Sequence, residues 1–383
     1  MTIMPFEIQI PEAALVDLRG RLANAAWPPP VEATGWAEGT PGAFLQTVVR
    51  YWQHEFDWRA QERRLNAVAQ FRVEIDGFTV HYLHVRSSRP DAVPLLMCHG
   101  WPGGNLEFLR VSQLLAHPED PRAPAFHVVA PAMPGYGFSS IPTRPGVNIT
   151  RIAALWTKLM SALGYERFGV QGGDWGAWVA LRLCRDHAPR LLGAHVNYVP
   201  ARYLPAPGSA GPGPTDEERA YLLERQRWID EESGYAHLQG TKPQTLALAL
   251  SDSPLGLAAW ILEKFHGWSD CHGDPAAVFS LDELLTNISV YWFTNTIYSS
   301  MRLYKEVVAE LAEGPGLTAR SPTRVAVARF PKEIAYPPRS HLERYLHIVR
   351  WTEMPAGGHF AALEQPVLLT RDIQAFFSGL DPS

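Results

Sequence analysis

The sequence of 383 residues is long enough for one large α/β domain with an insertion, or for two smaller domains. Hydrophobic residues make up 46% and charged residues 19%, which is typical of a soluble globular protein. The formal net charge of −5 gives no field that would attract nucleic acid or an anionic membrane surface, so neither is an expected partner.

The start of the chain and the cysteines indicate a cytoplasmic protein. Residues 1–10 have neither the basic start nor the apolar run of a signal peptide. Cys98, Cys184 and Cys271 are widely spaced and odd in number, as expected for reduced thiols rather than a disulfide framework or a zinc site.

Residues 1–70 differ in pattern from the rest and predict a wrapping N-terminal arm. Alternating apolar residues from Phe6 to Ile10 predict a short strand. Apolar residues at helical spacing then predict three helices, at about 11–25, 41–56 and 58–69.

From Phe71 the apolar residues alternate, and Asp76-Gly77 between two alternating runs predicts a β-hairpin. Buried strands and helices then follow one another, which predicts a mostly parallel sheet with helices on both faces. The predicted strands are 93–98, 126–130, 168–171 and 192–196, and the predicted helices are 152–163 and 175–185.

Residues 200–305 interrupt this alternation and predict an inserted helical cap. A Pro/Gly-rich linker at 205–214 leads into helices at about 217–234, 243–250, 255–265 and 281–311. The uncharged run from Leu284 to Met301 has the length of a membrane span but too many polar residues, so we expect a buried helix lining a pocket.

The alternation resumes after the cap, with strands at 325–330 and 345–351 and a final helix at 367–377. The predicted organisation is therefore an arm (1–70), an α/β-hydrolase core (71–199 and 306–383) and a cap (200–305).

The segment from Arg167 to Val179 predicts a nucleophile elbow. Gly172, Asp174 and Gly176 have the Gly-x-nucleophile-x-Gly spacing of a tight turn between strand and helix, which exposes the central side chain. An esterase has Ser at that position, whereas this chain has Asp174. A carboxylate is a competent nucleophile toward an activated sp3 carbon and forms an ester that water must then hydrolyse.

Such chemistry requires a base, and His359 is the candidate. It follows Gly357 and Gly358 in the loop between the last strand and the last helix, where the histidine of this fold lies. An acid should orient the imidazole, and Glu333 lies in the loop after the strand 325–330. Its rivals are Glu343 and Glu353.

The ester hydrolysis also requires an oxyanion site. The segment His99-Gly-Trp-Pro-Gly-Gly104 directly follows a buried strand, and the backbone N–H groups of Trp101 and Trp175 are expected to converge on the oxyanion. Trp101, Pro102 and Trp175 are also the predicted substrate-binding residues.

A proton donor for the leaving group should face Asp174 from the cap. A tyrosine, with a pKa of about 10, keeps its proton at neutral pH and can donate to an alkoxide. Composition does not choose among the tyrosines of the cap, which are Tyr221, Tyr235, Tyr291, Tyr298 and Tyr304.

Short segments along nearly the whole chain resemble the microsomal-type epoxide hydrolases, and the N-terminal arm is similar to that family's as well. The segments are His99–Gly104, Gly172–Gly176, Glu232–Tyr235, Thr241–Pro243, Leu303–Glu306, Phe330–Glu333 and Gly357–Pro366. The resemblance implies Asp174 as nucleophile, His359 as base, Glu333 as its acid, and Tyr235 and Tyr304 as the two ring-opening donors.

The sequence therefore predicts a cytoplasmic epoxide hydrolase that converts an epoxide and water to a vicinal diol through an Asp174 ester, without metal or cofactor. The aromatic content suggests bulky or aryl epoxides, and the resemblance alone suggests a homodimer. High Ala, Arg, Gly and Pro usage suggests a GC-rich bacterium, where relatives process epoxides in natural-product pathways, including those of enediyne antibiotics; such a tailoring role is a hypothesis.

Two alternatives stay open at this stage. A haloalkane dehalogenase shares the Asp nucleophile, the following Trp175 and the His base, and Trp101 could complete its halide site. A catalytically inactive ligand-binding relative is the alternative from another class of protein.

Overall fold

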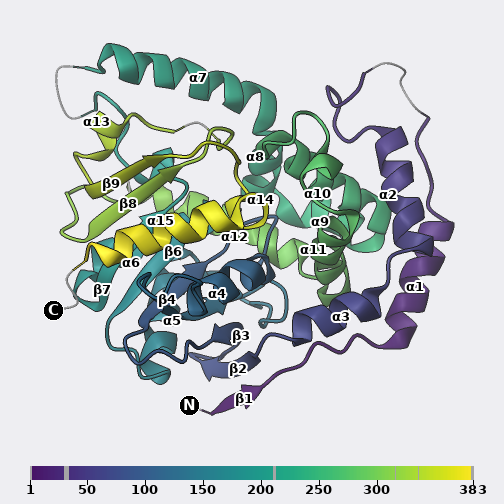
Figure 1. Cartoon of the computed structure of the whole chain (residues 1–383). Helices are drawn as coiled ribbons and strands as arrows, with labels where there is room; N and C mark the ends of the chain where they lie inside the picture. Colours follow the sequence, from purple (N-terminus) through teal and green to yellow (C-terminus); the bar gives the residue numbers. More distant parts are fainter. Residues whose placement is uncertain (1, 30–33, 210–212, 315, 335, 381–383) are drawn as a thin grey trace.

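Figure 1 shows the computed structural model, which describes residues 2–29, 34–209, 213–314, 316–334 and 336–380. These residues form a nine-stranded sheet in the order β1-β2-β3-β5-β4-β6-β7-β8-β9. The strands are β1 (Ile3–Pro5), β2 (Gln70–Ile75), β3 (Phe78–Val85), β4 (Val93–Cys98), β5 (Phe126–Pro131), β6 (Phe168–Gly172), β7 (Leu191–Val196), β8 (Arg324–Arg329) and β9 (His347–Glu353).

Pairing in the sheet changes from antiparallel to parallel along this order. The pairs β1–β2, β2–β3 and β3–β5 are antiparallel, and every later pair is parallel. The predicted α/β-hydrolase fold with a mostly parallel sheet is confirmed.

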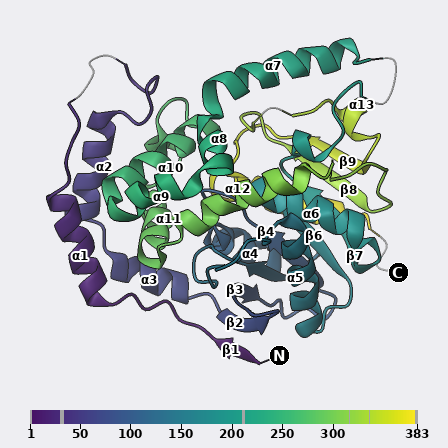
Figure 2. The same ribbon diagram turned by 180° about the vertical axis from the view of Figure 1, so that it is seen from behind.

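Helices cover both faces of the sheet, because alternate strand residues point to opposite sides. On β4, Leu95 and Met97 pack into one apolar cluster, while Leu96 and Cys98 pack into the other. Figures 1 and 2 show the two sides in turn. The first face carries α4 (Leu109–Ala116) and α15 (Pro366–Ser378), and the second carries α5 (Ile149–Ala162) and α6 (Asp174–Asp186).

The predicted hairpin is present between β2 and β3. Ile75 pairs with Phe78, and the turn residues Asp76 and Gly77 have positive φ values of 51° and 82°. A two-residue turn with positive φ at both positions matches the twist of the flanking strands.

The N-terminal arm consists of β1 and three helices: α1 (Glu12–Ala23), α2 (Gly42–His54) and α3 (Trp58–Asn66). The predicted strand at residues 6–10 is wrong, because the strand is Ile3–Pro5. The N–H groups of Ile8 and Ile10 instead donate to the side chains of Asn66 (2.8 Å) and Glu62 (2.7 Å), so the segment is held to α3 rather than to the sheet.

Between β7 and β8 the chain forms helices, called the cap below; those at residues 254–294 lie beside the arm, whereas the one at residues 216–232 extends away from it (Figures 1 and 2). Residues 210–212 of the predicted linker lie outside the described residues. The helices are α7 (Asp216–Glu232), α8 (Gly234–Thr241), α9 (Pro243–Asp252), α10 (Pro254–Trp268), α11 (Leu281–Thr294) and α12 (Ile297–Leu311).

The prediction of a single helix over 281–311 is wrong, because the helix breaks at Asn295. This residue has the left-handed conformation, with φ at 51°, and the N–H of Thr296 donates back to the Tyr291 carbonyl at 3.2 Å. Asn adopts this conformation more easily than other non-glycine residues and ends helices in this way. As a consequence, α12 continues past the predicted cap boundary at 305.

Among the described residues, no single helix has the length and hydropathy needed to cross a membrane; α9 and α10 meet both criteria only when taken together, and the chain bends by 117° between them. Two short α-helices, α13 (Arg339–Leu342) and α14 (Ala361–Glu364), and four 3-10 helices complete the described structure. The latter are η1 (Asn105–Phe108), η2 (Ala188–Arg190), η3 (Ala201–Tyr203) and η4 (Pro275–Ala277).

Candidate active site

Asp174 lies in the turn between β6 and α6 and has a positive φ of 46°. The turn is tight enough to require its two glycines. A Cβ on Gly172 would lie 2.2 Å from the Gly176 carbonyl oxygen, and a Cβ on Gly176 would lie 1.8 Å from the Cys98 carbonyl oxygen. Because no side chain fits at either position, the glycine spacing allows β4, β6 and α6 to approach and leaves the Asp174 carboxylate at the amino end of a helix.

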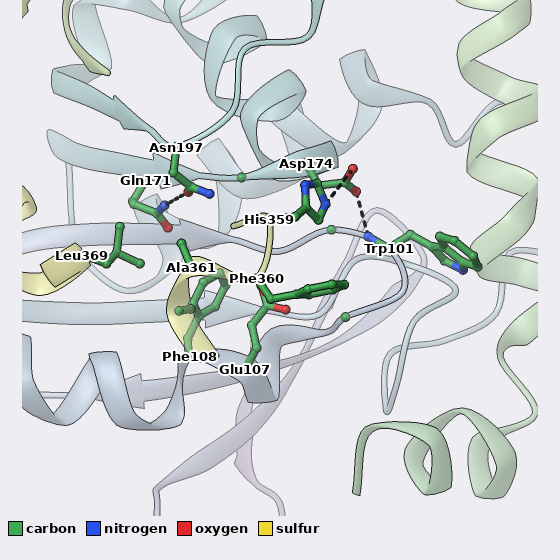
Figure 3. A pocket seen from close by; sticks show the side chains of 14 residues that line it. Trp101, Glu107, Phe108, Gln171, Asp174, Asn197, His359, Phe360, Ala361 and Leu369 are labelled. Atoms are coloured by element: carbon green, nitrogen blue, oxygen red, sulfur yellow. Dashed lines mark hydrogen bonds and ion pairs between the residues drawn. The ribbon is translucent and has the colours of Figure 1, made fainter. Parts of the chain in front are cut away.

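The two carboxylate oxygens of Asp174 have different partners (Figure 3). Oδ1 accepts a hydrogen bond from the backbone N–H of Trp101 at 2.8 Å, whereas Oδ2 lies 3.5 Å from Nε2 of His359. The loop that carries Trp101 can approach because Gly100 has no side chain: a Cβ there would lie 2.3 Å from Oδ1.

His359 is held by a buried carboxylate on the other side of its ring. Its Nδ1 donates to Oε1 of Glu333 at 2.6 Å, and the same oxygen accepts from the Ile334 N–H at 2.7 Å. This arrangement keeps the proton on Nδ1 and leaves Nε2 facing Asp174. The structure thus brings Asp174, His359 and Glu333 together in one chain of contacts.

The two rival carboxylates lie elsewhere. Glu343 pairs with Arg339, and Glu353 pairs with Arg329, both in exposed ion pairs. Neither is available to orient the imidazole, so the geometry favours Glu333.

The electrostatics of the histidine depend on its two carboxylates. Burial alone would lower the pKa of His359, but Glu333 and Asp174 outweigh it and hold the pKa well above its usual range. Burial raises the pKa of Glu333, and the neighbouring imidazolium opposes that rise. The imidazolium is therefore favoured as long as Asp174 carries its charge.

The loop of His359 is bonded to the end of α10. The His359 N–H donates to the Trp268 carbonyl at 2.8 Å. Glu364 accepts from the Phe360 N–H at 2.9 Å through one oxygen and from the Asp270 N–H at 2.8 Å through the other. The base is thus fixed to the cap. The sequence prediction did not include Asp270 or Glu364, although Glu364 lies in one of the segments that carry the family resemblance.

Tyr235 on α8 and Tyr304 on α12 lie close together with their ring centroids 5.8 Å apart. Tyr235 stacks on Trp101 at 5.4 Å, and Tyr304 meets Trp175 edge-on at 4.6 Å. Burial, with the charge of Asp174 adding to it, raises the pKa of both hydroxyls well above the usual value, so both keep their protons.

Trp101 and Pro102 are held against the cap. Among the described residues, Tyr235 and Tyr304 are the cap tyrosines with ring contacts to Trp101. Tyr291 instead donates its hydroxyl to the Gly103 carbonyl at 2.8 Å, next to the Pro102 carbonyl, which accepts from Asn287. The predicted contribution of the Trp175 N–H to the oxyanion site stays a prediction.

A small cavity lies beside Asp174 and His359 (Figure 3). Its volume of about 30 Å³ is enough for one or two water molecules, because one water needs about 10–15 Å³ by the same measure. Besides Asp174 and His359, three polar side chains line it: Glu107, Gln171 and Asn197. Gln171 donates to Asn197 at 2.8 Å, and burial raises the pKa of Glu107 to about 8. No sequence motif pointed to these residues.

Comparison with family models shows where the chain resembles known proteins. Residues 3–108 match the epoxide hydrolase N terminus, and residues 93–200 match the alpha/beta hydrolase fold.

Relatives and solved structures match over nearly the full chain. Epoxide hydrolase 1 of Oryctolagus cuniculus is 37% identical, over 98% of this chain and 88% of the relative. A protein of Stigmatella aurantiaca that is provisionally named an epoxide hydrolase is 42% identical, over 99% of this chain and 85% of the relative. The structure of Aspergillus niger epoxide hydrolase superposes with a TM-score of 0.87 at 31% identity, covering 100% of this chain and 97% of that one.

Proposed function

The chain belongs to the epoxide hydrolase family, and from this membership we propose that it adds water to an epoxide through a covalent ester on Asp174. The observation that carries the proposal is the unequal environment of the two Asp174 oxygens. Oδ1 accepts from a backbone N–H, whereas Oδ2 faces His359 at 3.5 Å and accepts no backbone hydrogen bond from the described residues, so Oδ2 is the oxygen that attacks carbon.

In the first step, Oδ2 of Asp174 attacks one ring carbon and the carbon–oxygen bond of the epoxide breaks. The released alkoxide takes a proton from Tyr235 or Tyr304, whose raised pKa values keep that proton in place until the ring opens. The product of this step is a hydroxyalkyl ester of Asp174.

In the second step, water attacks the Asp174 carbonyl carbon and gives a proton to Nε2 of His359. The charge that develops on Oδ1 is stabilised by the Trp101 N–H, which already donates to that oxygen at 2.8 Å. The ester bond then breaks, the leaving alkoxide takes the proton from His359, and the carboxylic acid formed on Asp174 loses its proton as the tyrosine is reprotonated.

The change of charge on Asp174 activates the base at the step that needs it. In the free enzyme the Asp174 carboxylate helps to raise the pKa of His359. Esterification removes that charge, so the pKa of His359 falls and the imidazole can accept a proton from water. Glu107, Gln171 and Asn197 line a cavity beside both residues, and we propose that it holds this water.

The proposal is tested by a single turnover of styrene oxide in water labelled with oxygen-18. Because water attacks Asp174 rather than the substrate, the label should enter Asp174 and not the diol. Label in the diol after a single turnover would contradict an ester mechanism. His359→Gln should accumulate a protein adduct with the mass of the epoxide, and Asp174→Ala, the control, should form none.

We propose bulky or aryl epoxides as substrates, because aromatic rings pack around the two tyrosines proposed as proton donors. The rings that pack together belong to Trp101, Trp175, Tyr235 and Tyr304. The cytoplasmic location and the homodimer stay predictions.

A haloalkane dehalogenase remains the second candidate because of one observation. The indole N–H groups of Trp101 and Trp175 are buried, and neither has a hydrogen-bond partner in the part of the chain that the structure describes. Such N–H groups could stabilise a departing halide. Incubation with a 1-haloalkane distinguishes the two: halide release without diol formation from epoxides would favour the dehalogenase.

A further inference from the structure

A cavity of about 310 Å³ lies between the arm, the segment after β4 and α11. Ligand pockets have volumes of roughly 300–1,000 Å³ and mostly apolar walls. Aliphatic side chains line this one: Leu65, Val68, Leu106, Leu109, Val290 and Leu363.

The cavity extends from the surface toward the catalytic residues. Arg64 and Arg110, which are exposed, mark its outer end, and Tyr136 and Tyr291, which are only 1% and 3% exposed, mark its inner end. Tyr291 donates its hydroxyl to the Gly103 carbonyl at 2.8 Å, and Gly103 also lines the small cavity beside Asp174, so this inner end lies near the nucleophile.

Glu107 separates this large cavity from the small one beside Asp174. Gly103 and Glu107 line both cavities. A Cβ on Gly103 would lie 2.1 Å from the Glu107 carboxylate, so this carboxylate lies directly against the glycine. The partition is therefore the end of a flexible side chain, and a change of its rotamer would join the two spaces.

The cavity beside Asp174 has room for water but not for an epoxide with substituents, whereas the large cavity has that room. We propose that the large cavity binds the apolar tail of the epoxide substrate while its ring reaches Asp174. This inference rests on the proposed function and adds the substrate class: epoxides with an extended apolar chain.

Thr286 points independently to a ligand in this cavity. It lies in the wall, it is 6% exposed, and its hydroxyl has no hydrogen-bond partner among the residues that the structure describes. A buried hydroxyl without a partner is unfavourable, and an oxygen on the substrate tail would satisfy it. Thr286→Val should therefore lower kcat/KM severalfold more for an epoxide whose tail carries a hydroxyl than for 1,2-epoxydecane.

The test compares 1,2-epoxybutane with 1,2-epoxydecane in two variants that narrow the cavity, Val68→Phe and Leu109→Phe. Both variants should lower kcat/KM for 1,2-epoxydecane roughly tenfold, since a misfit of a few methylene groups has at least that effect, and leave 1,2-epoxybutane within about twofold. Val16→Phe, on the exposed face of α1 and away from the cavity, is the matched control and should change neither.

Equal losses for both substrates, or no loss for 1,2-epoxydecane in a folded variant, would overturn the proposal. Binding of 1-decanol, followed by calorimetry, tests the cavity without turnover and should weaken roughly tenfold in Val68→Phe. Unchanged binding also contradicts the proposal. If the wild type makes no diol from any epoxide while decanol still binds in the cavity, the proposed function fails and the binding site does not.

Discussion

Asp174 has a backbone conformation that few side chains adopt, and the two glycines around it make that conformation possible. The requirement is steric, because the atoms that exclude a side chain at Gly172 and Gly176 belong to the backbone of neighbouring segments. Backbone atoms cannot move aside as the end of a flexible side chain can. The elbow is therefore a rigid support for the nucleophile.

We predict that Gly176→Ala lowers the free energy of unfolding by about 3 kcal/mol, because its Cβ would lie 1.8 Å from the Cys98 carbonyl oxygen. Urea denaturation measures this loss. Gly20→Ala, in the middle of α1 with no atom within 4 Å of the added Cβ, should instead raise stability by about 0.5–1 kcal/mol. Equal stability of the two variants would contradict the steric argument.

The raised pKa of His359 leads to a prediction about pH. The rate of ester hydrolysis needs a neutral imidazole, so it should fall as pH falls through the pKa of His359 in the ester form. Glu333 raises that pKa, and Glu333→Gln should therefore move the acid limb to lower pH. The maximal rate should also fall about a hundredfold, because the carboxylate no longer fixes the proton on Nδ1.

The measurement is a pH series of single-turnover hydrolysis rates of the accumulated ester. Glu343→Gln, which alters an exposed carboxylate paired with Arg339, is the control and should leave the profile unchanged. An acid limb that moves to higher pH in Glu333→Gln would show that Glu333 does not act through the charge of His359.

At the scale of elements, the loop between β9 and α15 that carries the base is bonded both to the end of α10 and to the loop after β8. Glu364 joins the loop of His359 to the residues that follow α10. Its carboxylate accepts from the N–H of Phe360 in the loop and from the N–H of Asp270 after the helix. The position of His359 therefore depends on the cap helix as well as on the sheet.

We expect Glu364→Gln to slow ester hydrolysis about tenfold while alkylation of Asp174 stays near the wild-type rate. An amide has one acceptor oxygen in place of two, so one of the two N–H groups loses its partner and the base shifts. The fraction of esterified enzyme at steady state, measured by protein mass spectrometry, should rise.

Glu353→Gln, on the exposed end of β9, is the matched control for this variant. If alkylation and hydrolysis slow by the same factor in Glu364→Gln, the substitution has damaged the site as a whole, and Glu364 does not position the base.

Local sequence rules predicted several elements well. The Asp76-Gly77 turn and the elbow around Asp174 each depend on a pattern of a few residues that are adjacent in the sequence. The sequence alone therefore predicts both turns. The strand predicted at residues 6–10 was wrong because side chains of Asn66 and Glu62, more than 50 residues away, bind the N–H groups.

The helix break at Asn295 and part of the site were missed for a related reason. The segment around Asn295 is uncharged and contains neither Pro nor Gly, so its helical pattern continues through the break. Asp174, Glu333 and His359 follow the chain order known for this fold and were located from it. The contact between Asp270 and Glu364 joins residues 94 positions apart, and only the folded chain brings them together.

At the scale of the whole molecule, the arm packs against the cap as well as extending the sheet. Trp52 donates to Ser289 at 3.1 Å, and Tyr51 and Gln61 both donate to Asp282 at 3.0 Å. These contacts join α2 and α3 to α11, which also lines the large cavity. Arm, cap and core are thus expected to unfold together.

Asp282→Ala should lower the free energy of unfolding by about 1–3 kcal/mol, because two part-buried donors lose a charged acceptor. Asp252→Ala removes another carboxylate that joins arm and cap, but its ion pair with Arg21 is exposed and should contribute less than about 1 kcal/mol. Urea denaturation followed by circular dichroism and tryptophan fluorescence measures both. Two separate transitions would contradict a single cooperative unit.

The bond between the His359 N–H and the Trp268 carbonyl also limits how molecules exchange with the site. A cap that swung away would have to break this bond or take the base with it, so we expect entry and exit through passages in a closed protein. The width of a molecule, rather than its reactivity toward a carboxylate, then determines its rate of association with the active site. In a mixture of epoxides the enzyme would therefore select by the rate of association as well as by the rate at which each ring opens.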